Sequence, residues 1–168
     1  MTTPFTPLSL CVLTVSDTRT QATDTSGQTL IELAQTAGHQ VYERALVVDC
    51  IYQIRAVLSR WIADNKVHVV LITGGTGFAG RDSTPEAVAV LLDKPVPGFG
   101  ELFRAESAKE IGTSTLQSRA MAGLANNTLI FCLPGSTGAC RTAWQIIAPQ
   151  IDNRTRPCNF VSVLNAPC

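Results

Sequence analysis

The chain has 168 residues, with 13 Lys and Arg against 13 Asp and Glu, a formal net charge of +0 and 45% hydrophobic residues. This length and apolar content predict one compact domain and exclude disorder as the main state. The zero net charge, without any run of Lys or Arg, argues against a nucleic-acid partner. Only 15% of the residues are charged, which leaves apolar surface for burial between subunits, so we expect a homo-oligomer.

The residues of the N-terminal segment predict neither a targeting signal nor a membrane span. Residues 1–7 contain two prolines and no basic residue, and the apolar run that follows is far shorter than the roughly 20 residues that cross a bilayer. We therefore expect a single domain over residues 1–168, with a flexible tail at 1–7, no membrane contact and a cytoplasmic location. The six cysteines include no C-x-x-C pair, and Cys11 and Cys132 lie in apolar runs, which predicts buried, reduced thiols.

Strand-like and helix-like segments alternate along the chain, which predicts an α/β fold: a three-layer α/β/α sandwich with a mostly parallel central sheet. A loop is expected at 94–100. Thr25 and Ser26 are predicted to cap the first helix, Gly38 to end it and Thr84 to cap the third. Apolar, β-branched runs predict the strands and helical spacing predicts the helices. The strands are at 8–15, 39–48, 67–72 and 128–133, and the helices at 28–38, 51–65, 85–93, 101–111, 116–124 and 139–151.

Three loops that follow predicted strands carry unusual polar or glycine-rich sequences. In parallel α/β sheets, ligands bind at the carboxyl ends of the strands. The first loop holds Ser16, Asp17 and Asp24, the second reads TGGTGFAGRDSTPEA from Thr73, and the third reads PGSTG from Pro134. Glycine-rich turns that lead into helices can direct backbone N–H groups at an anion, so they predict a phosphate-bearing ligand.

Two aspartates stand beside these turns. Asp82 lies between the glycine-rich turn and a predicted helix, where a carboxylate can hold Mg²⁺ beside phosphates, and Asp49 has the corresponding place after the second strand. Both positions also suit a helix cap. Arg81, Arg119 and Arg141 lie near the turns and are candidates for pairing with phosphate, although solvated surface charge is the simpler interpretation of any one arginine.

Residues 75–80 (GTGFAG) formally match the dinucleotide-binding motif G-x-G-x-x-G. That motif requires a helix packed closely on the sheet and a following strand that ends in an acid for the ribose. Asp93 supplies an acid, but no strand-like run appears between it and the strand predicted at 128–133. The charged pair Arg81 and Asp82 also lies where the helix should pack on the sheet. The context argues against a nicotinamide dehydrogenase. No P-loop motif and no acyl-transfer signature is present.

The segments LTVSDTR, DTSG, LITGGTGFAGRDSTPEA, PVPGFGE, GTSTLQSRA and LIFCLPGSTGACRTAW follow one another along the chain. In this order they resemble the MoaB/Mog family of molybdenum cofactor biosynthesis proteins, which includes the gephyrin G domain. The resemblance covers residues 8–160. It implies a three-layer α/β domain assembled as a trimer, or as a hexamer as in the MoaB branch. It also implies an activity, in which a terminal phosphate of molybdopterin attacks the α-phosphate of Mg-ATP and gives adenylylated molybdopterin and pyrophosphate.

The same resemblance implies roles for individual residues. Asp49 and Asp82 match the two aspartates that the activity requires, and Asp82 would also hold the Mg²⁺. Because the nucleophile is already an anionic phosphate, positioning and charge neutralisation replace a strong general base. The positions implied to bind the substrates molybdopterin and ATP are Ser16, Asp17, Thr73, Gly74, Gly75, Thr76, Gly77, Ser118, Arg119, Pro134, Gly135 and Ser136.

A second hypothesis is a non-catalytic molybdopterin carrier or storage protein of the same fold. Members of the MoaB branch differ in whether they carry the activity themselves or occur together with a separate Mog-type enzyme that carries it. The presence of Asp49, Asp82 and an intact TGGTG favours the enzyme, because pterin storage would not require groups that handle ATP. An unrelated nucleotide-binding or structural role is the third hypothesis.

Overall fold

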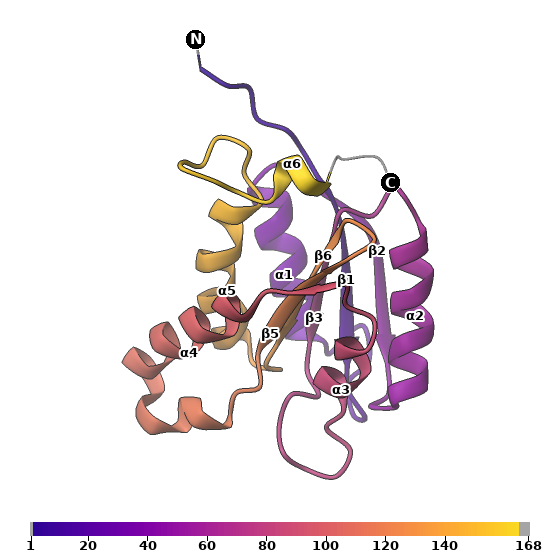
Figure 1. Cartoon of the computed structure of the whole chain (residues 1–168). Helices are drawn as coiled ribbons and strands as arrows, with labels where there is room; N and C mark the ends of the chain where they lie inside the picture. The colour runs from indigo at the N-terminus through magenta and orange to yellow at the C-terminus, as the bar shows by residue number, and fades with distance from the viewer. Residues whose placement is uncertain (1, 165–168) are drawn as a thin grey trace.

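A computed structural model describes residues 2–164, in which six strands form one sheet with helices on both of its faces (Figure 1). None of these helices is long and apolar enough to cross a membrane. The first elements in chain order are β1 (Ser9–Val15), α1 (Thr25–Thr36), β2 (Gln40–Val47), α2 (Ile51–Ala63), β3 (Val69–Thr73), α3 (Thr84–Ala89) and β4 (Lys94–Pro95). The remaining elements are α4 (Pro97–Ile111), the 3-10 helix η1 (Gly112–Gln117), β5 (Met121–Ala125), β6 (Thr128–Leu133), α5 (Thr137–Gln150) and α6 (Val161–Leu164).

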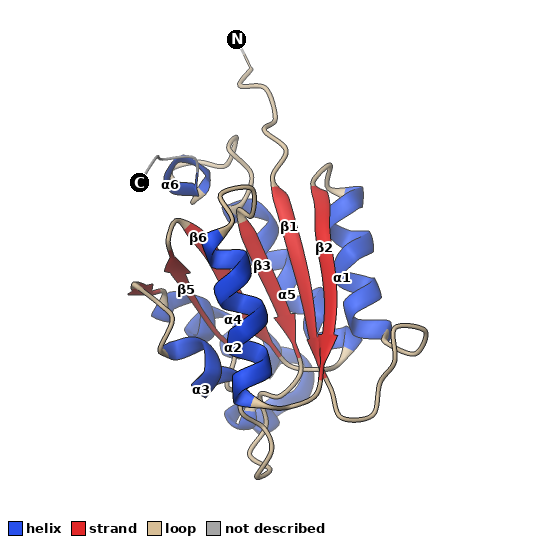
Figure 2. Ribbon diagram, turned by 90° about the vertical axis from the view of Figure 1, so that its right-hand side faces the viewer, coloured by secondary structure: helices blue, strands red, loops and turns tan. Residues whose placement is uncertain are grey.

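The sheet has the strand order β2-β1-β3-β6-β5-β4. Strands β2, β1, β3 and β6 run parallel to one another, and β5 pairs antiparallel with both β6 and β4. The predicted α/β fold with a mostly parallel sheet is confirmed. The four parallel strands direct their carboxyl ends to one edge of the sheet, which lies at the bottom of Figure 2.

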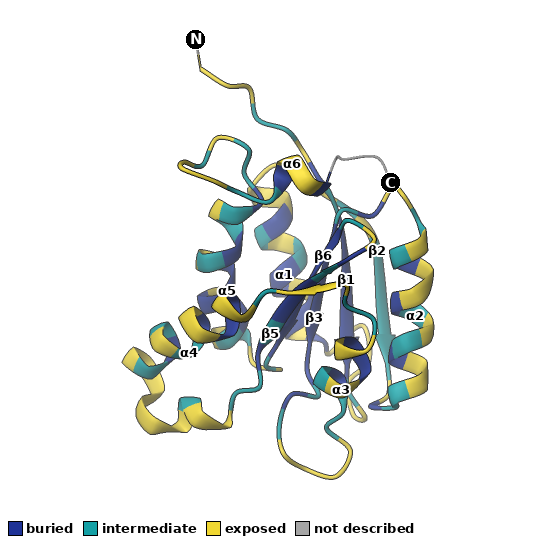
Figure 3. Cartoon of the chain, in the orientation of Figure 1, coloured by how far each residue is buried: buried dark blue, intermediate teal, exposed yellow. Residues whose placement is uncertain are grey.

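Each face of the sheet buries its own apolar cluster, because successive side chains of a strand point to opposite faces. On one face, Leu10 and Val12 of β1 belong to a cluster with α1, α4 and α5. On the other face, Cys11 and Leu13 pack in a cluster with α2 and α3. Trp61 of α2 is fully buried there, as its helical spacing predicts. Figure 3 shows the central strands buried between the two helical layers, while the tip of the loop between β3 and α3 is exposed.

Helix α1 begins earlier than the sequence predicts. Its N-cap is Asp24, whose carboxylate accepts a hydrogen bond from the Gly27 amide at 2.9 Å. The prediction that Thr25 and Ser26 cap this helix is wrong, because the aspartate carboxylate takes the capping position first. At the other end Gly38 has a φ of +91° and terminates the helical segment, as predicted.

Helix α3 also differs from its prediction. Ser83 holds the N-cap position, and the Thr84 hydroxyl donates to the Gly74 carbonyl oxygen at 2.8 Å instead of capping the helix. The helix ends at Ala89 and does not continue to residue 93. The Thr84 contact matters for the site, because it fixes the glycine turn that follows β3.

The predicted helix at 116–124 is wrong, because Met121–Ala125 forms strand β5. The segment MAGLA consists of residues that are common in helices, but its pairing with β6 overrides that weak local preference. Asn126 and Asn127, with φ of 46° and 61°, make the two-residue turn that joins the strands. Gly123 leaves room here for the Leu92 side chain, since a Cβ at this position would lie 2.5 Å from Leu92 Cδ1.

The predicted loop at 94–100 is also wrong. Residues 94 and 95 form β4, and α4 begins at Pro97, a residue whose fixed φ suits a helix start. A strand therefore does follow Asp93, but it lies at the sheet edge, three strands away from β3, and not beside it as a dinucleotide fold requires. The Asp93 carboxylate accepts a hydrogen bond from the Asn126 amide at 2.8 Å, which is a structural role.

The N-terminal residues contact the loop that follows α5. The Thr6 amide donates to Asn153 Oδ1 at 2.9 Å, and Asn153 Nδ2 donates to the Pro4 carbonyl oxygen at 2.8 Å. The Arg154 guanidinium lies 4.9 Å from the centre of the Phe5 ring. Residues 4–6 are thereby attached to the body of the protein.

The cysteines of the described region are free thiols, as predicted: Cys11, Cys50, Cys132, Cys140 and Cys158. The prediction that they are buried holds for Cys11, Cys132 and Cys140, but it is wrong for Cys158, which is exposed, and Cys50 is only half-buried. Burial raises the pKa of Cys11 to about 12 and also raises the pKa of Cys132. Both side chains therefore act as small apolar groups of the core. Cys168 lies outside the described residues.

Candidate functional site

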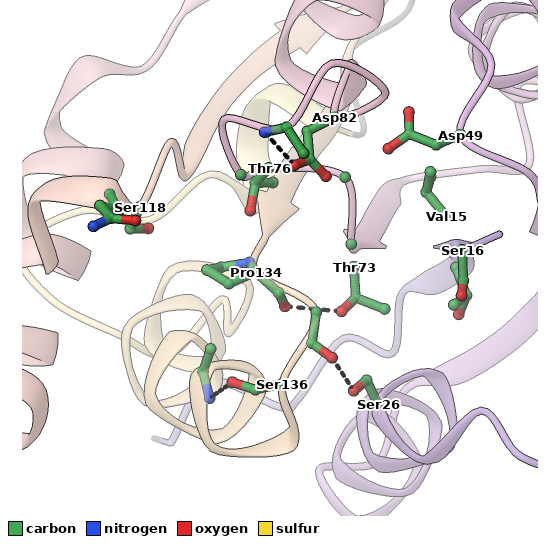
Figure 4. Close-up of a pocket in the computed structure, with 18 of the residues that line it drawn as sticks. Val15, Ser16, Ser26, Asp49, Thr73, Thr76, Asp82, Ser118, Pro134 and Ser136 are labelled. Atoms are coloured by element: carbon green, nitrogen blue, oxygen red, sulfur yellow. Dashed lines mark hydrogen bonds between the residues drawn. The ribbon is translucent and has the colours of Figure 1, made fainter. Parts of the chain in front are cut away.

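A cavity of about 640 Å³ opens where the four parallel strands end (Figure 4). The loops after β1, β2, β3 and β6 line one side of it, and α4 with η1 lines the other. Of the predicted site residues, Arg119 does not line the cavity, and neither does Arg141, another arginine that was a candidate for pairing with phosphate. Those that do are Ser16, Asp17, Asp49, Thr73, Gly74, Gly75, Thr76, Gly77, Asp82, Ser118, Pro134, Gly135 and Ser136.

The turn that follows β3 can be made only by glycine. Gly74 and Gly75 have φ of +99° and +68°, in the region that other residues avoid. A Cβ on Gly74 would lie 2.1 Å from the Val15 carbonyl oxygen, and one on Gly75 would lie 2.2 Å from the Thr84 hydroxyl oxygen. The turn therefore packs directly against the end of β1 and the start of α3.

Part of this turn offers backbone donors to a ligand. The Gly74 amide continues the sheet by donating to the Leu133 carbonyl oxygen at 3.0 Å. Within residues 2–164, no protein group accepts a hydrogen bond from the amides of Gly75, Thr76 or Gly77. Successive unpaired amides in a glycine-rich turn suit an anion such as a phosphate group.

Arg119 holds the segment between the glycine turn and α3. Its Nε donates to the Gly77 carbonyl oxygen at 3.0 Å, and its Nη2 donates to the carbonyl oxygens of Gly77 and Asp82 at 2.6 and 3.0 Å. Its Nη1 forms an ion pair with Glu86 of α3. With these donors committed to protein groups, Arg119 positions the loop and does not face the cavity.

Asp49 and Asp82 each keep one carboxylate oxygen available. Asp49 Oδ1 accepts hydrogen bonds from the Ser83 amide at 3.1 Å and the Ser83 hydroxyl at 2.7 Å, and Asp82 Oδ2 accepts from the Ala79 amide at 2.9 Å. The other oxygen of each carboxylate accepts no hydrogen bond from the described residues. Both side chains lie on the same side of the cavity in Figure 4.

These two carboxylates fit a magnesium ion that is held partly by its substrate. The described residues contain no group of three or more His, Cys, Asp or Glu side chains placed to hold a metal. Mg²⁺ that accompanies phosphates is commonly bound by one or two carboxylates, with phosphate oxygens and water as its other ligands. The available oxygens of Asp49 and Asp82 meet that requirement.

Three loops are joined in a closed circuit of hydrogen bonds beside these carboxylates. Arg81 donates from Nε to Asp17 Oδ2 at 2.7 Å and from Nη2 to Asp17 Oδ1 at 3.1 Å. The Asp49 amide also donates to Asp17 Oδ1, at 3.0 Å, and Asp49 in turn binds Ser83. The Arg81 guanidinium and the Asp49 amide hold the pKa of the Asp17 carboxyl below its usual range.

The PGS turn after β6 is held from two sides. The Thr73 hydroxyl donates to the Pro134 carbonyl oxygen at 2.9 Å, and the Ser26 hydroxyl of α1 donates to the Gly135 carbonyl oxygen at 2.6 Å (Figure 4). Ser136 caps α5 by accepting from the Ala139 amide at 3.1 Å. The turn thus brings the start of α5 to the cavity.

Asp24, which also lines the cavity, is fixed from behind. Its carboxylate is only 1% exposed and accepts hydrogen bonds from the Thr14 hydroxyl at 2.6 Å and from Arg44 Nη2 at 3.0 Å. A Cβ on Gly27 would lie 2.2 Å from this carboxylate. Asp24 therefore anchors the first loop between β1 and α1.

The individual residues of α4 and η1 that line the cavity were not predicted from the sequence. Ser107, Ser114 and Gln117 line the cavity there, together with the predicted Ser118, which stands apart from the other labelled residues in Figure 4. Nothing in their spacing signals a site. The segment GTSTLQSRA, through its resemblance to a family sequence, was the one available signal. Arg19 of the first loop was missed as well.

The fold and the cavity define an α/β protein whose ligand site, with unpaired turn amides and two carboxylates, is suited to phosphate groups. The family model MoCF_biosynth, described as "Probable molybdopterin binding domain", matches residues 11–153. The chain belongs to this family.

Individual relatives agree with this assignment. The chain is 59% identical over 161 residues to Molybdenum cofactor biosynthesis protein B of Escherichia coli (strain K12), which covers 95% of each sequence. A crystal structure of Molybdenum cofactor biosynthesis protein B is 44% identical, with a TM-score of 0.84, over 87% of this chain and 92% of that one. The tungsten cofactor synthesizing protein MoaB from Pyrococcus furiosus is 33% identical, with a TM-score of 0.78, over 86% and 92%. The resemblance to the MoaB/Mog family is confirmed.

Proposed function

We propose that this chain acts in molybdenum cofactor biosynthesis as a molybdopterin adenylyltransferase. One observation carries the proposal: the unpaired amides of Gly75 to Gly77 line the same cavity as the available carboxylate oxygens of Asp49 and Asp82. Family membership and the names of the relatives supply the pterin, since these proteins are named for the biosynthesis of this cofactor.

In the proposed reaction, an oxygen of the terminal phosphate of molybdopterin forms a bond to the α-phosphorus of ATP. The bond from that phosphorus to the oxygen that bridges to the β-phosphate breaks, and pyrophosphate leaves with the electron pair. The attacking oxygen is already anionic, so no side chain has to remove a proton. The work of this chain is to align the two phosphates and to stabilise the charge that moves to the leaving group.

The residues divide this work between them. The amides of Gly75, Thr76 and Gly77 donate to phosphate oxygens, in a turn that the neighbouring loops already hold. Asp49 and Asp82 would hold Mg²⁺, which when bound neutralises charge on the triphosphate. The neutral side chains of Ser107, Ser114, Gln117 and Ser118 on the opposite wall offer hydrogen-bond donors and acceptors to the pterin.

The test mixes the full chain with molybdopterin, Mg²⁺ and ATP labelled at the α-phosphate, and measures label on the pterin. Asp82→Asn should lower the transfer rate by about 10²-fold, the scale of losing one charge-stabilising group. Asp93→Asn is the matched control, because Asp93 supports the β5–β6 turn and does not line the cavity. Unchanged transfer in Asp82→Asn would contradict the proposed role, and binding of molybdopterin without any transfer would identify a non-catalytic carrier instead.

A further inference from the structure

We propose that Arg81 binds a phosphate group of the ligand in this cavity, and that it forms its ion pair with Asp17 only until the ligand binds. When the polyphosphate chain of a nucleoside triphosphate binds, the Arg81 guanidinium would break its ion pair with the Asp17 carboxylate and contact the phosphates. The inference rests on the proposed function, because it identifies a residue that binds the phosphates of the proposed co-substrate.

The charges that line the cavity show which ion pair a polyphosphate can rearrange. Four carboxylates line it, those of Asp17, Asp24, Asp49 and Asp82, against the guanidinium groups of two arginines, Arg19 and Arg81. Asp24 is already paired with Arg44, and the proposed Mg²⁺ would offset the charges of Asp49 and Asp82, so the pair of Asp17 and Arg81 is the one left for the ligand to rearrange. A guanidinium that moves from a carboxylate to the ligand leaves the total charge of the cavity unchanged, but it brings a positive group into contact with the phosphates.

The Arg81 side chain is already arranged as phosphate requires. It offers two parallel donors, Nε and Nη2, to the two oxygens of Asp17, and a phosphate group presents the same pair of acceptors. Arg81 is adjacent in sequence to Asp82 and follows the unpaired amides of the glycine turn by four residues. Its guanidinium is thus attached to the same loop as the other phosphate-binding groups.

The exchange is energetically accessible because the pair is exposed. The Arg81 and Asp17 side chains are 66% and 39% exposed, and ion pairs of this kind contribute little net stability. A polyanion that also binds the turn amides can therefore compete for the guanidinium. The arginine side chain can rotate to the ligand while its backbone stays in place.

The rest of the loop circuit does not depend on this pair. Asp17 keeps the hydrogen bond from the Asp49 amide when Arg81 leaves, and Asp49 keeps both of its bonds to Ser83. The three loops remain connected during the exchange. Arg81 is therefore the movable member of a framework whose other members stay fixed.

Calorimetric titration of the full chain with Mg-ATP, and separately with inorganic tripolyphosphate, tests the role of Arg81. Arg81→Gln should weaken both affinities roughly tenfold, since it removes a charge-assisted two-point contact, and Arg81→Lys should recover only part of the loss. Arg60→Gln is the matched control. Arg60 makes a similar exposed fork to Glu43, at 2.6 and 2.8 Å, and neither residue lines the cavity.

A double-mutant cycle tests the part of Asp17. Asp17→Asn should tighten Mg-ATP binding, both because it releases Arg81 and because it removes a negative charge. In the Arg81→Gln background only the second effect remains, so the gain should be several-fold smaller than in the otherwise unchanged chain. An equal gain in Mg-ATP affinity in both backgrounds would show that Asp17 acts only by repelling the ligand. It would overturn the proposal that Asp17 holds Arg81 until the ligand binds.

The other outcomes separate this inference from the proposed function. Affinities unchanged by Arg81→Gln, in a chain that still transfers adenylyl groups, would overturn the inference and leave the function standing. Arg81-dependent tripolyphosphate binding without any transfer would support the inference and contradict the function. A chain that binds neither Mg-ATP nor tripolyphosphate would overturn the inference. Thermal unfolding checks the fold, because Arg81→Gln should unfold near the unchanged chain's Tm but gain less from added Mg-ATP.

Discussion

Arg119 donates two hydrogen bonds to the carbonyl oxygen of Gly77, although the two residues lie 42 positions apart in the sequence. The same guanidinium reaches the Asp82 carbonyl oxygen. One side chain thereby fixes both ends of the segment from Gly77 to Asp82, and with it the placement of the turn amides and of the Asp82 carboxylate. A residue whose sequence context suggests a substrate ligand thus has a positioning role in the structure.

Arg119→Lys is expected to reduce adenylyl transfer by roughly tenfold or more, because an ammonium group cannot bond both carbonyl oxygens in the same plane. The free energy of unfolding should fall by about 1–3 kcal/mol. Arg55→Lys is the control, because Arg55 also donates to two carbonyl oxygens, those of Ala87 and Glu86, away from the cavity. It should change stability and leave transfer intact. Equal transfer rates in the two variants would contradict the positioning role.

Gly75→Ala and Gly80→Ala lie in the same loop and should behave in opposite ways. At Gly75 a Cβ would meet Thr84 Oγ1 at 2.2 Å and Asp49 Oδ2 at 2.8 Å, in a backbone conformation that disfavours alanine. We expect a loss of about 2 kcal/mol or more in unfolding free energy, together with loss of ATP binding. At Gly80 nothing lies within 4 Å of an added Cβ, so alanine should be neutral or stabilising by up to about 1 kcal/mol. Urea unfolding measures both, and equal losses would refute the prediction.

Acid should destabilise the protein through its two histidines. His39 and His68 accept backbone hydrogen bonds at Nδ1 from Leu8 and Ser9, at 3.1 and 3.0 Å, and burial lowers the pKa of each below 6.5. The unfolded chain binds these protons more readily. The contribution to stability is therefore complete above pH 6.5 and is lost as pH falls from there through the lower pKa of the folded state.

Urea unfolding at several pH values between 8 and 5 measures this dependence. The double variant His39→Gln, His68→Gln should be less stable than the unchanged chain at pH 8, because one buried and one partly buried hydrogen bond are weakened. Its stability should also fall less on acidification. The same fall in both proteins would assign the acid sensitivity to other groups.

We also propose that the chain forms a homo-oligomer. Leu102, Ile111 and Leu116, on α4 and η1, are 48%, 51% and 77% exposed, in a chain with few charged residues to cover them. Sedimentation at micromolar concentration should show a species larger than the 18.0 kDa chain. A single species of that mass would contradict the proposal.

The cavity could be located from the sequence because residues from four of its loops directly follow predicted strands. Ser16, Asp49, Thr73 and Pro134 stand at or just beyond the ends of β1, β2, β3 and β6, and parallel strands bring those ends together. The apolar runs that mark β1, β3 and β6 are buried on both faces, so their pattern is strong, whereas β2 at the edge of the sheet is only partly buried. The fold and the position of the cavity could both be predicted from this pattern of apolar strands followed by polar or glycine-rich loops.

The parts that escaped prediction depend on contacts between distant segments. Local preference favours a helix for the segment from Met121, and only its pairing with β6 makes it a strand. Nothing near Arg119 in the sequence indicates that its guanidinium binds Gly77 and Asp82. The capping of α1 by Asp24 was likewise hidden, because adjacent threonine and serine residues are comparable caps.

The circuit that links Asp17, Asp49 and Ser83 has a thermodynamic consequence for ligand binding. These bonds are made between the protein's own groups, so the conformational entropy of the three loops is lost when the chain folds. A phosphate ligand then pays little for ordering the loops, and its affinity reflects its contacts more directly. Binding should therefore show a small heat-capacity change, close to that expected from the surface the ligand itself buries, without the larger change that accompanies loop folding.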